Sequence, residues 1–435
     1  MQDFLVIPLS FILHPCAGLT FFAKWKQLHW YHVSNDIPII RMLNILMVPY
    51  TESLGHAGRS LEFAKCLSRN TGSVTIAGGG QFDYIFPFEV IGSPQVPYHS
   101  LKNWSLFYLP GLPYFEAFNH HICTDFDRTF GNRLLTLDCL TENWLKILED
   151  QQPDIIIADG RPDVFWAAQI LGIPMLGITS VTWTSDFMDN YPKVCFRFPA
   201  KNGCDARYLS NFNEVGRRYG RSPVVDCWKP FFGSGRLIPD SILFTCKNLP
   251  DDFTVIGPHI WNGGGQCDIG ILEKMNNNSP LVYITSGTSV FTYFHEVARI
   301  LVAEGYQVIF SGGVRDSDDS NIQIRDGIYY CNGLVSGFEI AKKSDLMVCH
   351  GGAQTLYQAA LAGIYSIVIP QSFEHERNGI MFADKGLASM VYSNLPVAEA
   401  CKEIIRFLKN PKNINIRLID EETCRNHALQ LAKYL

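Results

Sequence analysis

Continuous apolar runs alternate with longer amphipathic segments from residue 42 onward. Residues 43–49 (LNILMVP) are followed by a segment with helical spacing around 58–70 and by a second apolar run at 73–80. The same order recurs over 154–180. Apolar strands separated by helices are typical of a parallel sheet that is covered on both faces. The first half of the chain is therefore predicted to be a doubly wound α/β domain.

The second half repeats this pattern and predicts a second domain of the same kind. Its apolar runs lie at 281–287, 306–313, 327–333, 345–352 and 365–371. A stretch rich in Gly and Asn separates the halves, which indicates a linker. We predict an extension (1–41), a Rossmann-like domain (42–260), a linker (261–279) and a second Rossmann-like domain (280–435). The last segment reads as a helix, and one arrangement packs it back on the N-terminal domain.

The segment before the first strand has two interpretations. Residues 4–23 have nearly the length of a membrane span, but Pro8, His14 and Pro15 interrupt them. Asp3 stands where a secretory signal would be basic, so a cleaved signal is not expected. We favour a dispensable extension or a mis-chosen start over a membrane anchor with the body in the cytoplasm.

Composition narrows the class of protein. The chain has 435 residues, of which 47% are hydrophobic, so it can bury large cores. A net charge of −6 argues against a nucleic-acid partner. The 13 cysteines are scattered and never spaced as CxxC, which predicts reduced thiols with neither a disulfide framework nor a zinc site. We expect a cytoplasmic protein, with peripheral membrane contact left open.

Glycine-rich turns follow three predicted strands of the second domain. They read SGTS (286–289), SGG (311–313) and HGGAQT (350–355). Open α/β sheets bind ligands at the carboxyl ends of their strands. Glycine lets the backbone approach a ligand, and a following helix offers free N–H groups to an anion. These turns predict a diphosphate cradle, although no GxxxxGK[ST] or GxGxxG fingerprint occurs.

The run HGGAQTLYQAALAGIYSIVIPQSFEHERNG (350–379) resembles the donor-binding signature of nucleotide-sugar glycosyltransferases of the GT-B fold. The likeness is to the UDP-glycosyltransferase and macrolide-glycosyltransferase group. SLGHAGRSLEFAKCL (53–67) is similar to the start of their first helix, and LVYITSGTS (281–289) is similar to the same proteins. The resemblance spans residue 42 to the C-terminus. It implies two Rossmann-like doubly wound parallel-sheet domains that face each other across a cleft.

Matched position by position, the resemblance also implies donor-binding residues. His350 and Gly352 would contact the diphosphate, and Glu374 and His375 would bind sugar hydroxyls. Val335 would lie beside the nucleobase. The remaining implied donor-binding positions are Gly55, Thr288, Ala353, Gln354, Thr355, Gln358 and Asn378.

The chain departs from the family pattern at positions that set donor identity. Gln358 replaces the glutamate that holds the ribose hydroxyls, and a neutral amide forms no charge-assisted hydrogen bond. His375 replaces a glutamine of the sugar site, and Leu334 stands where plant members stack an aromatic ring on uracil. The resemblance therefore leaves the sugar and the nucleobase open.

Inverting transfer needs a base that removes the acceptor hydroxyl proton, and His56 is the predicted base. It follows the first strand, whereas Asp159 ends the strand DIIIAD in the same domain. Carboxyl ends of parallel strands meet at one edge, so Asp159 could orient His56 and stabilise its imidazolium. Both positions match the family's His–Asp pair.

Other chemical candidates are weighed against this pair. His120 and His121 read as acceptor-loop or structural residues. The acidic pairs of 125–127 and 316–318 match a metal-binding DxD only formally, because neither follows a hydrophobic strand. We predict no catalytic metal and no cofactor besides the nucleotide-sugar donor. The positive end of a helix would then stabilise the departing diphosphate.

The leading hypothesis is an inverting, metal-independent transferase that moves a hexose from a UDP- or dTDP-sugar to a hydroxyl acceptor. The aromatic segments 104–118 and 181–192 either line a pocket for a lipid, polyketide or phenolic acceptor or belong to the core. Two alternatives remain: a sugar-nucleotide 2-epimerase of the same fold and a non-catalytic nucleotide-sugar-binding homologue.

Overall fold

The structure is a computed structural model, and it describes the chain in several stretches. These are residues 43–51, 53–69, 72–94, 134–183, 210–226, 229–241, 244, 252–263, 270, 279–287, 292–312, 322–331, 334–411 and 414. The predicted extension (1–41) and the predicted final helix lie outside them. Of the helices in these stretches, none is both long and apolar enough to cross a membrane.

The first half of the chain forms a seven-stranded parallel sheet in the order β3-β2-β1-β4-β5-β6-β7. Its strands are β1 (Leu43–Pro49), β2 (Gly72–Gly78), β3 (Glu89–Gly92), β4 (Ile155–Asp159), β5 (Met175–Ile178), β6 (Gly235–Ile238) and β7 (Phe253–Val255). Its helices are α1 (Leu54–Ser68), α3 (Leu134–Gln151), α4 (Phe165–Leu171), α6 (Ser210–Arg218) and α7 (Lys229–Phe232).

The second half forms another seven-stranded sheet, in the order β10-β11-β9-β8-β12-β13-β14. Its strands are β8 (Leu281–Thr285), β9 (Gln307–Ser311), β10 (Ile322–Arg325), β11 (Ile328–Cys331), β12 (Leu346–Cys349), β13 (Tyr365–Val368) and β14 (Ala388–Met390). Its helices are α9 (Thr292–Ala303), α10 (Gly337–Lys343), α11 (Ala353–Ala362), α12 (Phe373–Asp384) and α13 (Val397–Lys409). All neighbouring pairs are parallel except β10 with β11.

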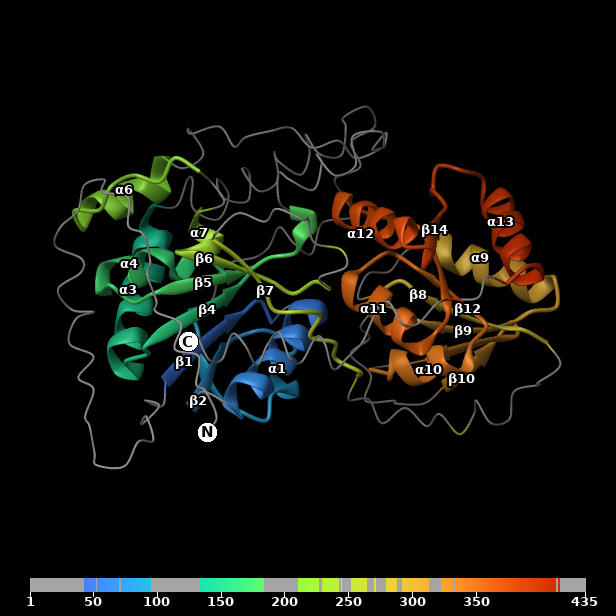
Figure 1. Ribbon diagram of the computed structural model, residues 1–435, viewed down its shortest axis with the longest axis horizontal. Coiled ribbons are helices and arrows are strands. Elements are labelled where there is room, and N and C mark those ends of the chain that lie inside the picture. The colour runs from blue at the N-terminus through green and yellow to red at the C-terminus, as the bar shows by residue number, and fades with distance from the viewer. Residues whose placement is uncertain are drawn as a thin grey trace, which may run out of the picture. The chain divides into compact units, whose positions relative to one another are not determined.

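Helices cover both faces of each sheet (Figure 1). Alternate residues of the strands enter different cores. In β1, Ile45 packs with α1 on one face, whereas Leu46 packs with α3 and α4 on the other. In β8, Tyr283 packs with α10 and α11, and Val282 packs with α9 and α13. This period of two explains the uninterrupted apolar runs in the sequence. The predicted fold class, two doubly wound α/β sheets, is confirmed.

Candidate active site

The structure brings His56 and Asp159 together at the carboxyl edge of the first sheet. β1 and β4 are neighbours, and Pro49 lies opposite Asp159 in the parallel register. The turn after β1 leads into α1, whose first turn carries His56. His56 Nδ1 lies 2.6 Å from Asp159 Oδ1. The His56 side chain is 32% exposed and the Asp159 side chain only 1%, so the ring can meet a ligand while the carboxylate is shielded.

Two further residues of α1, neither of them predicted from the sequence, bind the same carboxylate. Arg59 Nε donates to Asp159 Oδ2 at 2.7 Å, and a second guanidinium nitrogen donates to Oδ1. Ser60 Oγ donates to Oδ2 at 3.1 Å. The sequence GHAGRS indicates their position, because Arg59 and Ser60 come three and four residues after His56 and lie on the same side of the helix.

Arg59 fixes the charge of Asp159. Burial by itself raises the pKa of Asp159, but the positive charge of Arg59 and the contact with His56 outweigh it, and the pKa falls well below its usual range. The same pairing raises the pKa of Arg59 against the opposite effect of burial. Asp159 is therefore an anion at neutral pH.

This anion selects one tautomer of His56. Arg59 Nη2 lies 2.8 Å from the same His56 nitrogen, but it already donates to Asp159 Oδ1. The carboxylate can only accept a hydrogen bond, so its 2.6 Å contact favours a proton on His56 Nδ1. With Nδ1 protonated, Nε2 keeps its lone pair and can take a proton from a bound hydroxyl. The Tyr50 ring lies edge-on to His56, with ring centroids 5.9 Å apart. The arrangement is that of a general base held by a buried carboxylate.

At the second sheet, His350 occupies the turn between β12 and α11. Two glycines leave room for its ring. A Cβ on Gly287 would lie 2.7 Å from Cε1 of His350, and a Cβ on Gly352 would lie 2.6 Å from Nε2. Burial lowers the pKa of His350 to about 4, so the ring is neutral at pH 7. Within the described part of the chain, its buried Nδ1 has no hydrogen-bond partner. Gly287 and Gly352 thus make space for the His350 ring, in addition to any role in forming the turns.

α12 carries three more predicted donor-site residues, two of which contact this turn. The His375 ring meets that of His350 edge-on, with ring centroids 4.6 Å apart. Burial, followed by the nearby His350, lowers the pKa of His375 well below its ordinary value. Asn378 Nδ2 donates to the Gly351 carbonyl at 3.0 Å. Burial raises the pKa of Glu374, which lies within electrostatic reach of His56 and Arg59. The buried Nδ1 of His375 and Oδ1 of Asn378 lack partners among the described residues, as His350 Nδ1 does.

The remaining predicted donor residues are placed as follows. Gly352 caps α11, and Ala353, Gln354, Thr355 and Gln358 lie on that helix. Gln354 and Gln358 hydrogen-bond to the backbone of 259–261. Val335 is partly buried just before α10, and Gly55 lies in the first turn of α1. Several predicted positions lie outside the described residues: Thr288, His120, His121, 125–127, 316–318, 104–118 and 184–192.

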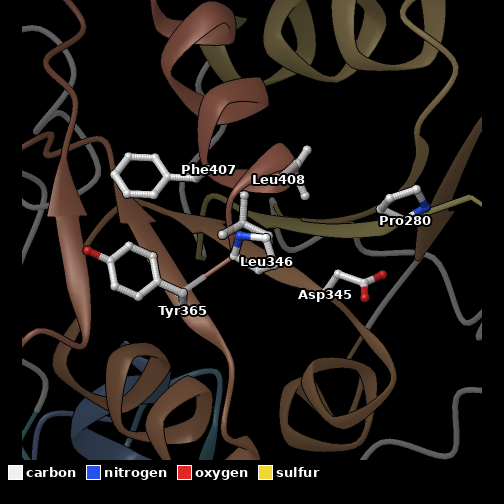
Figure 2. Close-up of a pocket in the computed structure, with 7 residues that line it drawn as sticks. Pro280, Asp345, Leu346, Tyr365, Phe407 and Leu408 are labelled. Carbon is white, nitrogen blue, oxygen red and sulfur yellow. The ribbon is translucent and has the colours of Figure 1, made fainter. Parts of the chain in front are cut away.

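A small pocket of about 100 Å³ lies at the opposite edge of the second sheet (Figure 2). Leu346 and Tyr365, the first residues of β12 and β13, line it together with Phe407 and Leu408 of α13. Because these are the amino ends of the strands, the pocket is separate from the turn at His350, which follows the carboxyl end of β12.

Comparisons with known proteins place the chain among glycosyltransferase relatives. Residues 281–415 match the glycosyltransferase family 28 C-terminal domain. A PGL/p-HBAD biosynthesis rhamnosyltransferase of Mycobacterium bovis (strain BCG / Pasteur 1173P2) is 23% identical over 60% of this chain. That match spans 63% of the relative's length, so it leaves more than a third of that protein unmatched. A PGL/p-HBAD biosynthesis glycosyltransferase of Mycobacterium tuberculosis (strain ATCC 25177 / H37Ra) is 20% identical over 78% of this chain and 79% of its own length.

Solved structures show the same fold. A glycotransferase of kitacinnamycin aligns with a TM-score of 0.61 and 16% identity, over 91% of this chain and 98% of that protein. A spinosyn rhamnosyltransferase complexed with thymidine diphosphate aligns with a TM-score of 0.55 and 16% identity, over 90% of this chain and 95% of that protein. The predicted resemblance to nucleotide-sugar glycosyltransferases of the GT-B fold is confirmed.

Proposed function

Because the chain is a relative of the GT-B glycosyltransferases and carries a glycosyltransferase family 28 C-terminal domain, we propose that it is an inverting, metal-independent glycosyltransferase. It moves a hexose from a UDP- or dTDP-sugar to a hydroxyl of a hydrophobic acceptor. The observation that carries the proposal is the 2.6 Å contact between His56 and the buried Asp159 at the carboxyl edge of the first sheet.

In the proposed reaction, His56 Nε2 takes the proton of the acceptor hydroxyl as its oxygen attacks the anomeric carbon. The new bond joins that carbon to the acceptor oxygen. The bond from the anomeric carbon to the diphosphate oxygen breaks, and its electron pair leaves with the nucleoside diphosphate. Attack from the face opposite the leaving group inverts the anomeric centre. Asp159 stabilises the imidazolium that His56 becomes.

The second sheet supplies the groups that would bind the leaving diphosphate. The first N–H groups of α11 point toward the turn at His350, and the helix dipole favours negative charge there. His350 is a neutral ring at pH 7, so it would contribute a hydrogen bond and no charge. We propose that these groups replace a metal ion in stabilising the leaving group.

Two findings favour a deoxythymidine nucleotide as donor. A structurally similar rhamnosyltransferase binds thymidine diphosphate, and the curated relatives include rhamnosyltransferases. We therefore place dTDP-sugars before UDP-sugars in the donor range.

One assay tests the proposal. The protein is incubated with dTDP- and UDP-sugars, with and without candidate lipid, polyketide or phenolic acceptors, and nucleotide release is followed. We expect acceptor-dependent release that His56→Ala abolishes while calorimetric binding of dTDP persists. Lys65→Ala, a change at a partly exposed residue of the same helix that pairs with Glu62, is the matched control and should keep full activity.

Three results of this assay would contradict the proposal. Transfer that survives in His56→Ala would refute the assignment of the base. Loss of activity with EDTA that added Mg²⁺ restores would refute metal independence. Nucleotide-sugar binding without turnover across the acceptor panel would favour a binding protein.

A further inference from the structure

One face of α11 forms hydrogen bonds to residues 240–241, which follow β6, and to residues 259–261, which follow β7. Gln354, Tyr357 and Gln358 are spaced i, i+3 and i+4, so their side chains leave the helix on one side. Each of the three hydrogen-bonds to residues between 240 and 261. The helix that begins at the donor-site turn is thereby attached to the other half of the protein.

The two glutamines bind the backbone of residues 259–261. Gln354 Nε2 donates to the His259 carbonyl at 2.9 Å, and Gln354 Oε1 accepts from the Trp261 N–H at 3.0 Å. Gln358 Nε2 donates to the Trp261 carbonyl at 2.6 Å. A side-chain amide can donate and accept, whereas an ionised carboxylate only accepts. A glutamate at position 358 would direct negative charge at that carbonyl, so this contact requires the glutamine.

Trp261 connects these contacts to the helix that carries His56. A Cβ added to Gly58 would lie 2.9 Å from the Cβ of Trp261 and 3.2 Å from its ring. Trp261 also packs against the core cluster that includes Phe63 and Leu61 of α1. The residue that α11 binds through its glutamines is therefore pressed against the first turns of α1.

Tyr357 makes a second, separate attachment. Its hydroxyl donates to Asp240 Oδ1 at 3.2 Å and accepts the Ser241 N–H at 2.9 Å. The other oxygen of Asp240 accepts from Ser180 Oγ at 2.8 Å and from the Val181 N–H at 2.7 Å. Tyr357 thus ties α11 to the ends of β5 and β6 through one buried carboxylate.

We propose that Gln354, Tyr357 and Gln358 form a latch that sets the start of α11 against the start of α1. The latch holds the donor-site turn at His350 in register with the base at His56. Gln358 is then a positioning residue that acts through Trp261, and its amide is engaged by the protein itself. The catalytic part of this inference rests on the proposed function, whereas the latch itself does not.

Hydrogen exchange tests the latch without any substrate. The Trp261 N–H should exchange about fivefold faster or more in Gln354→Ala, because its acceptor is lost. Gln358→Glu should speed exchange over residues 256–263 by a similar factor. Gln323→Ala, which changes a half-buried glutamine on β10 that accepts a hydrogen bond from Arg325, is the matched control. Exchange within twofold of wild type in both latch variants would overturn the proposal.

Nucleotide binding separates the latch from a ribose-binding role. We expect Gln358→Ala to leave the Kd values of UDP and dTDP within about threefold of wild type. A loss of about tenfold or more for UDP alone would show a ligand of the 2′-hydroxyl and overturn the positioning role. In the transfer assay, Gln358→Ala and Tyr357→Phe should lower kcat with little change in the donor KM. A rise in donor KM at constant kcat would contradict the latch.

Absence of transfer in the wild type would leave the exchange test intact, so the two proposals fail separately. Gln358→Glu sharpens the distinction further. If position 358 binds ribose, the carboxylate should tighten UDP binding, because a charged acceptor forms stronger hydrogen bonds. If position 358 belongs to the latch, the same change should loosen 259–261 without tightening UDP.

Discussion

Replacing Asp159 by asparagine tests the buried charge cluster of the first domain. The two oxygens of Asp159 accept hydrogen bonds from His56, from two nitrogens of Arg59 and from Ser60. Asparagine offers one oxygen, and its NH2 group would face donors. Arg59, whose side chain is only 12% exposed, would keep its charge without a counter-ion. Removing one partner of a buried ion pair costs about 3–5 kcal/mol. Because some water reaches Arg59, we expect a loss of about 3 kcal/mol.

A double-mutant cycle with Arg59→Met isolates this coupling. The free energy of unfolding is measured by urea denaturation for the wild type, both single variants and the double variant. Removing both charges should cost about 2 kcal/mol less than the sum of the single losses, since neither partner is then left charged and buried. If the single losses add to within about 0.5 kcal/mol, the two groups are independent and the description of the cluster is wrong.

The same substitution has a signature in pH and in rate. The folded-state pKa of Asp159 lies below its ordinary value of 3.8, so its stabilising contribution is complete above that pH. It is lost as the pH falls below 3.8 toward the folded value, and Asp159→Asn should remove this acid-dependent loss. Asparagine also ceases to select the Nδ1–H tautomer, so kcat should fall roughly 10²- to 10⁴-fold while dTDP binding persists.

Three further predictions concern Gly58, His259 and His350. Gly58→Ala should lower the free energy of unfolding by about 1–3 kcal/mol, because its Cβ would meet Trp261 at 2.9 Å. At Gly55 the nearest atom is 3.9 Å away, so Gly55→Ala should lower the free energy of unfolding by less than about 1 kcal/mol. Equal losses in the two variants would contradict the contact. Burial lowers the pKa of His259 to about 3, so between pH 6.5 and 3 the imidazole binds a proton only in the unfolded state. The free energy of unfolding should therefore fall by up to about 1.4 kcal/mol per pH unit on acidification. His259→Gln should reduce that slope, which urea denaturation at about pH 7 and about pH 5 measures. His350→Asn should weaken dTDP binding by a constant factor from pH 5.5 to 8, because the pKa of about 4 keeps His350 neutral over that range. Calorimetry measures the ratio of the two Kd values, and a ratio that changes near pH 6.5 would refute the neutral state of His350.

The sequence predicted the first domain's dyad because topology alone brings its members together. His56 and Asp159 each follow a strand, and the carboxyl ends of adjacent parallel strands share an edge. Arg59 was not found, since an arginine on a helix surface is usually solvated, and only the tertiary contact with Asp159 shows that it is nearly buried. Local pattern therefore predicted the contact between His56 and Asp159 but not the arginine that sets the charge of Asp159.

Two other features show where pattern was insufficient. β10 was not predicted, although Asp326–Gly327 is a hairpin turn signal and both residues have positive φ. Its short, partly polar strand has no continuous apolar run to mark it. Gln358 could be assigned by resemblance only to the ribose, because nothing in the sequence indicates that residues 259–261 pass beside α11. Contacts between segments about 100 residues apart have no local signal.

Residues 56–60 of α1 contain the proposed base His56, the glycine against which Trp261 packs and two donors to Asp159. Each of these side chains or spaces is matched by a residue far away in the chain. A chimera that joins the first sheet of a related protein to the second sheet of this one is subject to the same constraint. Trp261 lies between β7 and β8 and contacts both α1 and α11. A chimera joined in this segment therefore separates Trp261 from one of its two original partner helices. Chimeras that exchange the halves at the linker should therefore need residues 58, 261, 354 and 358 to be transferred as one group.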